Sequence, residues 1–301
     1  LADNGFLHVY NMQGGILAWI SAGYPVYVKY SSIQMAINAA DPGDIIFVSS
    51  GTYYEKIVVD KSVSLFGENK ETTIIDGSGT ETVVHITANN VVIKDFTISN
   101  GGKSAYWESS VLLESQSCTI SANTITGSFL GIVLLSAGKS KIVGNEVYNI
   151  NGDHGIYIND SNETLVADNK VHNNIRGITI DNSSDSVIIR NQIHNNSNCG
   201  VWFSAMHKST FTKNNSSGNG VGINFEADSQ DNLILENYFC ENGIGIRLDN
   251  ASNNLIYHNN FMNNSLQVET NGLINSWDDG YPSGGNYWSD YNGTDLYNGP
   301  Y

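Results

Sequence analysis

The sequence predicts an all-β protein, a parallel β-helix solenoid of about nine or ten coils. Three observations carry this prediction. The phrase Gly-apolar-x-apolar recurs every 22 to 24 residues from Gly131 to Gly245. An asparagine follows each of these glycines by 14 or 15 residues. The stretch 43–281 contains no proline, as an uninterrupted backbone ladder requires.

The recurring asparagines are expected to form a column inside the solenoid. Stacked coils place equivalent residues about 4.8 Å apart, so each repeated position becomes a column. An inward column must be apolar or hydrogen-bonded, and an Asn amide both donates and accepts. Asn also tolerates the left-handed backbone of a tight corner. The expected ladder is Asn123, Asn145, Asn169, Asn191, Asn214, Asn237 and Asn259. A second column, five residues later, is Asn174, Asn196, Asn219, Asn242 and Asn264.

The elements follow in order along the chain. Residues 32–40 have helical periodicity, end at Asp41-Pro42-Gly43, and lie in an N-terminal capping segment, 30–44, that covers the open end of the coils. The β-helix is expected over 45–268. Its short strands include 45–48, 57–59, 63–66, 73–75, 83–86, 91–98, 111–113, 177–180, 187–190 and 192–194. Residues 269–301, rich in aromatic and acidic side chains, are expected to form an irregular C-terminal cap.

Composition excludes several classes of protein. The 301 residues carry a net charge of −16, which argues against nucleic acid as a partner. No apolar run approaches the roughly 20 residues that span a bilayer, so we expect no membrane insertion by this chain. The architectural alternative is a leucine-rich repeat, which needs Leu five residues before the ladder Asn. That position instead holds Ser140, Thr164, Ser186, Ser209 and Asn232.

The opening of the repeat region resembles a known family. Residues 31–77, SSIQMAINAADPGDIIFVSSGTYYEKIVVDKSVSLFGENKETTIIDG, resemble the start of the pectin-lyase-like right-handed parallel β-helix. The coils that follow, and GNYWSDYNGTD at 285–295, are similar to the NosD-like, periplasmic copper-binding branch found in archaeal surface proteins. The resemblance covers about 30–301 and implies a right-handed coil. It implies no single activity, because this fold hosts lyases, hydrolases, epimerases, adhesins and scaffolds.

A second resemblance concerns the first residues. Residues 6–26, FLHVYNMQGGILAWISAGYPV, look like the last strand and helix of a rhodanese domain, so 1–29 is interpreted as its C-terminal remnant. The catalytic Cys of a rhodanese lies upstream of this segment. Sulfurtransferase activity is therefore not carried over, and we expect a longer parent protein.

The sharpest catalytic candidate is Asp153-His154 with Arg176, which follows one coil later in the column of His154. An acid, a base and a cation within one coil step are the groups that abstract a proton beside a uronate carboxylate. The competing interpretation is a solvated corner whose charges lie close by chance, and on balance we predict no catalytic residue.

Metal-binding candidates are similarly sparse. Three residues after the ladder Asn, neighbouring coils carry His172 and His194, whose imidazoles suit copper. Asp290, Asn292 and Asp295 offer oxygen ligands spaced for a calcium loop, although they lack the full EF-hand pattern. The alternatives are an outward polar column and a simple terminal cap. We predict no required cofactor, with calcium as the one candidate.

Nine Asn-x-Ser/Thr sequons occur, a small excess over the roughly six that 40 asparagines would produce by chance. Asn162 and Asn182 fall at corners and are the candidate glycan acceptors, whereas Asn214 belongs to the inward ladder and should be inaccessible.

The leading hypothesis is a non-catalytic extracellular or cell-surface rod with a structural, adhesive or self-assembly role. Its expected partners are further copies, surface-layer proteins or glycans. The first alternative is a polysaccharide lyase or uronate epimerase, and the second is a copper-handling accessory protein.

Overall fold

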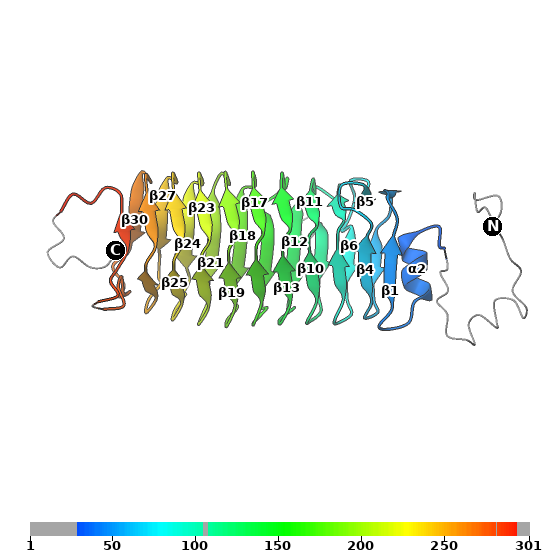
Figure 1. Ribbon diagram of the computed structural model, residues 1–301, viewed down its shortest axis with the longest axis horizontal. Helices are drawn as coiled ribbons and strands as arrows, with labels where there is room; N and C mark the ends of the chain where they lie inside the picture. Colours follow the sequence, from blue (N-terminus) through cyan, green and yellow to red (C-terminus); the bar gives the residue numbers. More distant parts are fainter. Residues whose placement is uncertain (1–28, 105–107, 281, 294–301) are drawn as a thin grey trace, which may run out of the picture. The chain divides into compact units, whose positions relative to one another are not determined.

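The computed structural model describes residues 29–104, 108–280 and 282–293. The chain consists of two units, and the second, which begins at Ser32, is the solenoid. Its short strands pair in parallel across successive coils and form three sheets (Figure 1). The all-β parallel β-helix of about ten coils predicted from the sequence is confirmed. The segment that resembles a rhodanese, 6–26, lies outside the described residues.

The three sheets, called A, B and C, take one strand each from nearly every coil. Sheet A contains β1 (Ile45–Val48), β4 (Ser64–Gly67), β7 (Val92–Lys94), β10 (Thr119–Ser121), β13 (Lys141–Val143), β16 (Leu165–Ala167), β19 (Val187–Ile189), β22 (Thr210–Thr212), β25 (Leu233–Leu235) and β28 (Leu255–Tyr257). Sheet B contains β2 (Gly51–Tyr53), β5 (Thr73–Asp76), β8 (Thr97–Ser99), β11 (Thr124–Thr126), β14 (Glu146–Tyr148), β17 (Lys170–His172), β20 (Gln192–His194), β23 (Asn215–Ser217), β26 (Tyr238–Cys240), β29 (Asn260–Met262) and β31 (Tyr287–Trp288). Sheet C contains β3 (Ile57–Val59), β6 (Val84–Ile86), β9 (Ser109–Leu113), β12 (Leu130–Leu135), β15 (His154–Asn159), β18 (Arg176–Asp181), β21 (Cys199–Ser204), β24 (Val221–Glu226), β27 (Ile244–Leu248) and β30 (Leu266–Thr270).

Two expectations about the corners were wrong. The run 91–98 is two strands, β7 and β8, because Asp95 between them adopts a left-handed φ of 63° and turns the chain. The left-handed residue of this corner is also not the ladder asparagine. It is the residue immediately before it, as at Ala122 (φ 54°) and Arg190 (φ 55°), so the asparagine itself keeps ordinary backbone angles and turns its amide inward.

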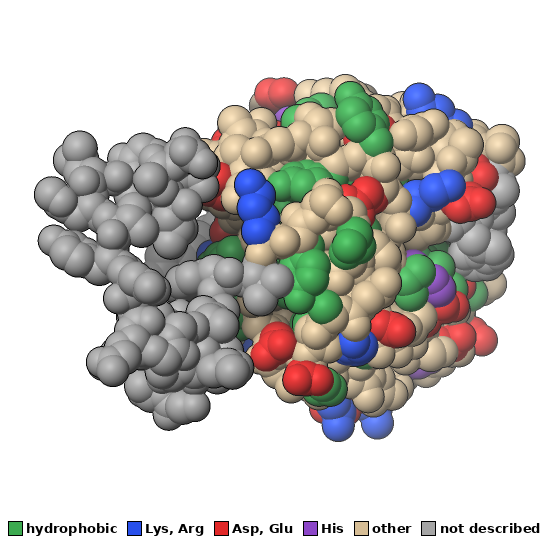
Figure 2. Space-filling view, turned by 90° about the vertical axis from the view of Figure 1, so that its right-hand side faces the viewer, with side chains coloured by type: hydrophobic (Ala, Val, Ile, Leu, Met, Phe, Trp, Pro, Cys, Tyr) green, Lys and Arg blue, Asp and Glu red, His purple; other side chains and the backbone are tan. Residues whose placement is uncertain are grey.

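The helix α2 (Ile33–Ala39) covers the first coil. Ser32 is its N-cap and accepts a hydrogen bond from Met35 N, and Glu55 accepts bonds from Ile33 N and Gln34 N. Ile33 and Ile37 are buried against the coil below. At this end of the solenoid, hydrophobic side chains are also exposed among polar ones (Figure 2). In β1, Phe47 is 73% exposed.

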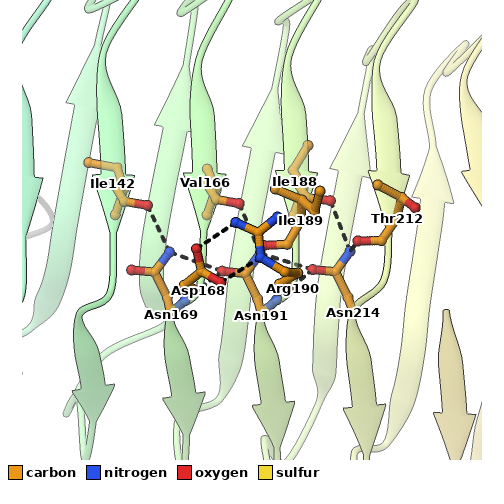
Figure 3. Close-up of polar contacts among 10 residues, drawn as sticks. All are labelled: Ile142, Val166, Asp168, Asn169, Ile188, Ile189, Arg190, Asn191, Thr212 and Asn214. Carbon is orange, nitrogen blue, oxygen red and sulfur yellow. Dashed lines mark hydrogen bonds and ion pairs between the residues drawn. The ribbon is translucent and has the colours of Figure 1, made fainter. Parts of the chain in front are cut away.

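Each of the predicted ladder asparagines is buried and bonds to the next coil. Asn191 Oδ1 accepts from Asn169 N at 2.9 Å and from Asn169 Nδ2 at 3.0 Å, while Asn191 Nδ2 donates to Val166 O at 2.9 Å (Figure 3). The amide therefore satisfies backbone groups that the corner leaves unpaired. The column runs from Asn123 to Asn259 and continues into the tail at Asn286.

Two further polar columns share this arrangement. In the second Asn column, Asn196 Oδ1 accepts from Asn174 N at 3.1 Å. The position five residues before the ladder Asn forms a third column, which the sequence analysis used only to exclude leucine-rich repeats. There Ser209 Oγ accepts from Ser186 N at 3.0 Å, and Asn232 Oδ1 accepts from Ser209 N at 3.0 Å. The third column has no single residue type, because either a hydroxyl or an amide oxygen satisfies the backbone N–H.

Candidate functional site

The predicted Asp153, His154 and Arg176 lie together on the outer side of sheet C. His154 begins β15 and Arg176 begins β18, and the two are direct partners in the parallel pairing. Arg176 Nη1 donates to Asp153 Oδ2 at 2.6 Å, and His154 Nε2 lies 3.5 Å from the same oxygen. One carboxylate therefore faces both the guanidinium and the imidazole.

His154 is enclosed by its neighbours rather than exposed at a solvated corner. Its exposed fraction is 3%, its Nδ1 lies 2.9 Å from Thr179 Oγ1, and its ring stacks on Tyr157 with centroids 4.8 Å apart. Burial is the main cause that lowers the His154 pKa to about 4, while Asp153 opposes the shift and Arg176 adds to it. The imidazole is therefore neutral near pH 7, and its edges are occupied by protein groups.

Arg176 joins this cluster through an ion pair and an aromatic ring, and one of its nitrogens has no partner among the described residues. Its guanidinium lies over the ring of Trp202, with Cζ 3.6 Å from the ring centroid, while Nη1 remains on Asp153. Arg176 Nε and Asn224 Oδ1 are buried polar atoms without a partner among the described residues. Within this cluster, the His154 side chain is 4% exposed, whereas that of Asp153 is 33% exposed.

Tyr157, Thr179 and Trp202 also belong to this cluster and were not among the residues predicted from the sequence. A signal for them exists, because all three stand two residues after a repeat glycine and alternate with inward residues. That position forms an outward column along sheet C: Val133, Tyr157, Thr179, Trp202, Asn224 and Arg247.

On sheet B, His172 and His194 are adjacent, as expected from the column. Their rings stack with centroids 4.8 Å apart and planes 2° apart, and Tyr148 stacks on His172 at 5.2 Å. His172 Nε2 lies 3.2 Å from Glu146 Oε1, which also pairs with Lys170 Nζ at 2.8 Å. Hydrogen bonding from Lys170 is the main cause that lowers the Glu146 pKa, and burial is the main cause that lowers the His194 pKa.

This histidine pair does not fit a copper ion. Parallel imidazoles 4.8 Å apart cannot both direct a nitrogen lone pair at one ion roughly 2.0 Å from each. His172 Nε2 also already faces Glu146. Within 29–104, 108–280 and 282–293, no three His, Cys, Asp or Glu side chains gather as a metal-binding group. Cys118 and Cys199 are buried, and burial raises the pKa of the Cys199 thiol to about 12.

The remaining candidates are spread over the surface. Asp290 and Asn292 are described, but the third calcium candidate, Asp295, lies outside the described residues. Asn162 and Asn182 are exposed at corners and border a shallow polar cavity of about 350 Å³. Asn182 Nδ2 donates to Asp160, whereas Asn162 Oδ1 accepts from Ser184 N at 2.7 Å.

Asn214 is 2% exposed and fully engaged in the ladder, so its sequon is inaccessible in the folded chain. Among the described helices, none is long and apolar enough to cross a membrane.

Comparison with known proteins places the chain in a family. Residues 38–293 match the family described as periplasmic copper-binding protein (NosD), and the chain belongs to this family. A cell surface glycoprotein of Methanothermus fervidus is 36% identical over 104 residues, which are 34% of this chain and 16% of that protein. The chain thus spans a small part of this relative's length.

Solved structures share the fold at low sequence identity. The A-module of mannuronan C-5 epimerase AlgE6 from Azotobacter vinelandii has a TM-score of 0.54 at 15% identity, covering 85% of this chain and 93% of that one. XylC in complex with xylose has a TM-score of 0.66 at 12% identity, with 79% and 66% covered. The Dettilon tailspike protein has a TM-score of 0.52 at 18% identity, with 83% and 46% covered. Such likeness shows the fold alone.

Proposed function

We propose that this chain is a non-catalytic β-helix module of a cell-surface protein, with a structural or adhesive role outside the cell. The observation that carries the proposal is that the charged and titratable groups of the cluster on sheet C contact one another. His154 is buried and neutral near pH 7, Asp153 is paired with Arg176, and Arg176 lies on Trp202. The surface location is supported by the relative named as a cell surface glycoprotein. Further copies, surface-layer proteins and glycans are its proposed partners.

The second candidate is a lyase or epimerase that acts on acidic polysaccharides. It is favoured by the outward position of the cluster on sheet C and by the mannuronan epimerase among the proteins of like fold. In that mechanism Asp153 or His154 would take the proton and Arg176 would hold the uronate carboxylate.

One assay separates these candidates. The protein is incubated with alginate and with pectate, with and without calcium, and unsaturated products and uronate epimerisation are measured. We expect no turnover. Turnover that disappears in Asp153→Asn but persists in Asp181→Asn, an acidic control at the other end of the adjoining sheet C strand, would refute the non-catalytic function.

The copper-handling alternative is disfavoured by the parallel histidine rings. We expect calorimetric titration with Cu²⁺ to show no stoichiometric submicromolar site. Tight binding that is lost in the double variant His172→Ala/His194→Ala would restore this alternative.

A further inference from the structure

The nine Asn-x-Ser/Thr sequons differ in how much of each the fold leaves accessible. The motif consists of an Asn amide, which receives the sugar, and a hydroxyl two residues later, which the transferring enzyme must also reach. Eight sequons lie wholly within the described residues, and the ninth, at Asn292, extends to Thr294 outside them. The folded chain therefore offers a described acceptor only where both groups are exposed.

Two sequons expose both groups. Asn195 and Ser197 are exposed, and so are Asn263 and Ser265. None of these four side chains forms a hydrogen bond with another described residue. Asn195 also has space beside it, because the equivalent residue of the next coil is Gly218, where a Cβ would lie 2.7 Å from Asn195 Oδ1.

The second Asn column holds these two sequons in place. Both lie at the corner between a strand of sheet B and the next strand of sheet C, which we call the B–C corner. The middle residue, Asn196 or Asn264, belongs to the second Asn column and is buried, and Asn196 N donates to Asn219 Oδ1 at 2.9 Å. Asn195 and Asn263 have left-handed φ angles of 56° and 54°. With the middle residue fixed inside, the amide and the hydroxyl both face outward.

The two acceptors predicted from the sequence are less accessible than these. Asn162 is exposed, but the hydroxyl of its sequon belongs to Thr164, which is 1% exposed. Asn182 Nδ2 donates to Asp160, and the hydroxyl of its sequon belongs to Ser184, which is half-buried. The hydroxyl residues of the other four described sequons are buried or half-buried: Ser161, Ser216, Ser217 and Ser252.

We propose that Asn195 and Asn263 are the residues at which the folded chain accepts N-linked glycans. In this transfer, Nδ2 forms a bond to C1 of the first sugar of a lipid-linked oligosaccharide. The bond between C1 and the phosphate oxygen breaks, and the amide loses one proton as the lipid phosphate leaves. A separate oligosaccharyltransferase catalyses the step, so this chain supplies only the acceptor.

The two acceptors lie in one column of the solenoid. They are three coils apart, which corresponds to roughly 14 Å at the usual strand spacing. Their glycans therefore cover the B–C corner and leave the outer side of sheet A uncovered. The proposal rests on the proposed location outside the cell. It fails separately from the non-catalytic function, which only turnover of a polysaccharide would refute.

The test uses the folded 301-residue chain, a solubilised oligosaccharyltransferase and a lipid-linked oligosaccharide. A short Asn-x-Thr peptide establishes that the enzyme is active, and glycopeptide mass spectrometry measures the occupancy of each sequon. We expect the occupancy of Asn195 and Asn263 to exceed that of Asn162 and Asn182 at least about tenfold, because the latter corners must first open locally. When the same enzyme acts on a proteolytic digest of the chain, this difference should disappear.

Variants of the B–C corner test the geometry directly. Ser197→Ala should abolish transfer to Asn195 and leave Asn263 unchanged. Asn173 occupies the equivalent position one coil before Asn195, is exposed and has a φ of 56°, but Ile175 stands where a hydroxyl is needed. Because Ile175 is 42% exposed, Ile175→Ser should keep the fold and make Asn173 an acceptor. The matched control Ile175→Ala should leave Asn173 unmodified.

Circular dichroism establishes that each variant is folded. A folded wild-type chain that remains unmodified at both Asn195 and Asn263 would overturn the proposal. Occupancy of Asn162 or Asn182 equal to that of Asn195 would overturn it as well, since accessibility in the folded chain would then not select the acceptor. A folded Ile175→Ser chain without transfer to Asn173 would contradict the role of the B–C corner.

Discussion

The Asn ladder can be tested at two adjacent asparagines that differ only in the direction of the side chain. Asn214 lies in the ladder, and Asn215 begins β23 and is exposed. Asn214 Nδ2 donates to Ile188 O and Thr212 O, each at 2.9 Å (Figure 3). It also donates to Asn237 Oδ1 at 3.1 Å. Its Oδ1 accepts from Asn191 N and Asn191 Nδ2, both at 2.9 Å.

Asn214→Ala removes all five of these hydrogen bonds. Asn191 Nδ2 keeps Val166 O, but Asn191 N loses the acceptor that the side chain supplied. At about 1 kcal/mol net per bond, with about 1–3 kcal/mol for a buried orphaned donor and some relaxation of the corner, we expect a loss of about 3–5 kcal/mol. Asn215→Ala should change the free energy of unfolding by less than about 0.5 kcal/mol.

Guanidinium denaturation followed by circular dichroism measures both variants against the wild type. With a slope near 6 kcal/mol per M, a loss of 4 kcal/mol lowers the midpoint by roughly 0.7 M. Because solenoids can unfold in segments, hydrogen exchange of the β19 to β26 amides should locate the loss in the coils that contact residue 214. Equal midpoint shifts for the two variants would refute the reasoning that inward amides hold adjacent coils together.

Two further predictions concern pH and backbone strain. The folded His154 pKa of about 4 lies below the unfolded value near 6.5, so the unfolded state binds the proton first and stability falls as pH drops from 6.5 to 4. The free energy of unfolding should fall by about 3 kcal/mol over this range. In His154→Gln this part of the pH dependence should be absent, and a profile of stability against pH that does not change would contradict the prediction. Ala122 has a φ of 54° where the next coil has Gly144, so Ala122→Gly should raise the thermal midpoint and stabilise the fold by about 0.5–1 kcal/mol. A lower midpoint would contradict the strain at Ala122.

Most of the solenoid could be predicted from the sequence because the repeat places the same residue types at equivalent positions of successive coils. The Gly phrase and the asparagines at one spacing require equivalent positions to stack, and the helix at 33–39 follows from Ser32 and the apolar residues Ile33 and Ile37. The corner between β7 and β8 could not be predicted. Asp95 turns the chain within a run that has the pattern of one strand. The turn is not visible in the sequence because a left-handed φ is not restricted to glycine or asparagine.

The candidate site was predicted only as a set of residues. Asp153, His154 and Arg176 are indeed adjacent, because the 22-residue separation of His154 and Arg176 equals one coil. The repeat places Tyr157, Thr179 and Trp202 in one outward column, but it does not indicate that this column contacts His154 and Arg176. The contacts with His154 and Arg176 depend on side-chain direction and packing, which the repeat spacing does not specify.

The amino-acid sequence by itself determined which residues stack on one another. The spacing of the repeat allows only one register between the parallel strands of neighbouring coils. The tertiary structure decided which of the stacked side chains remain available to other molecules. His154 is neutral near pH 7 because neighbouring coils enclose it, and outward residues of sheet A such as Val187 and Leu233 remain at least partly exposed because none of the described elements covers them. Burial and pKa depend on everything that surrounds a group, and a linear pattern records only its neighbours in the repeat.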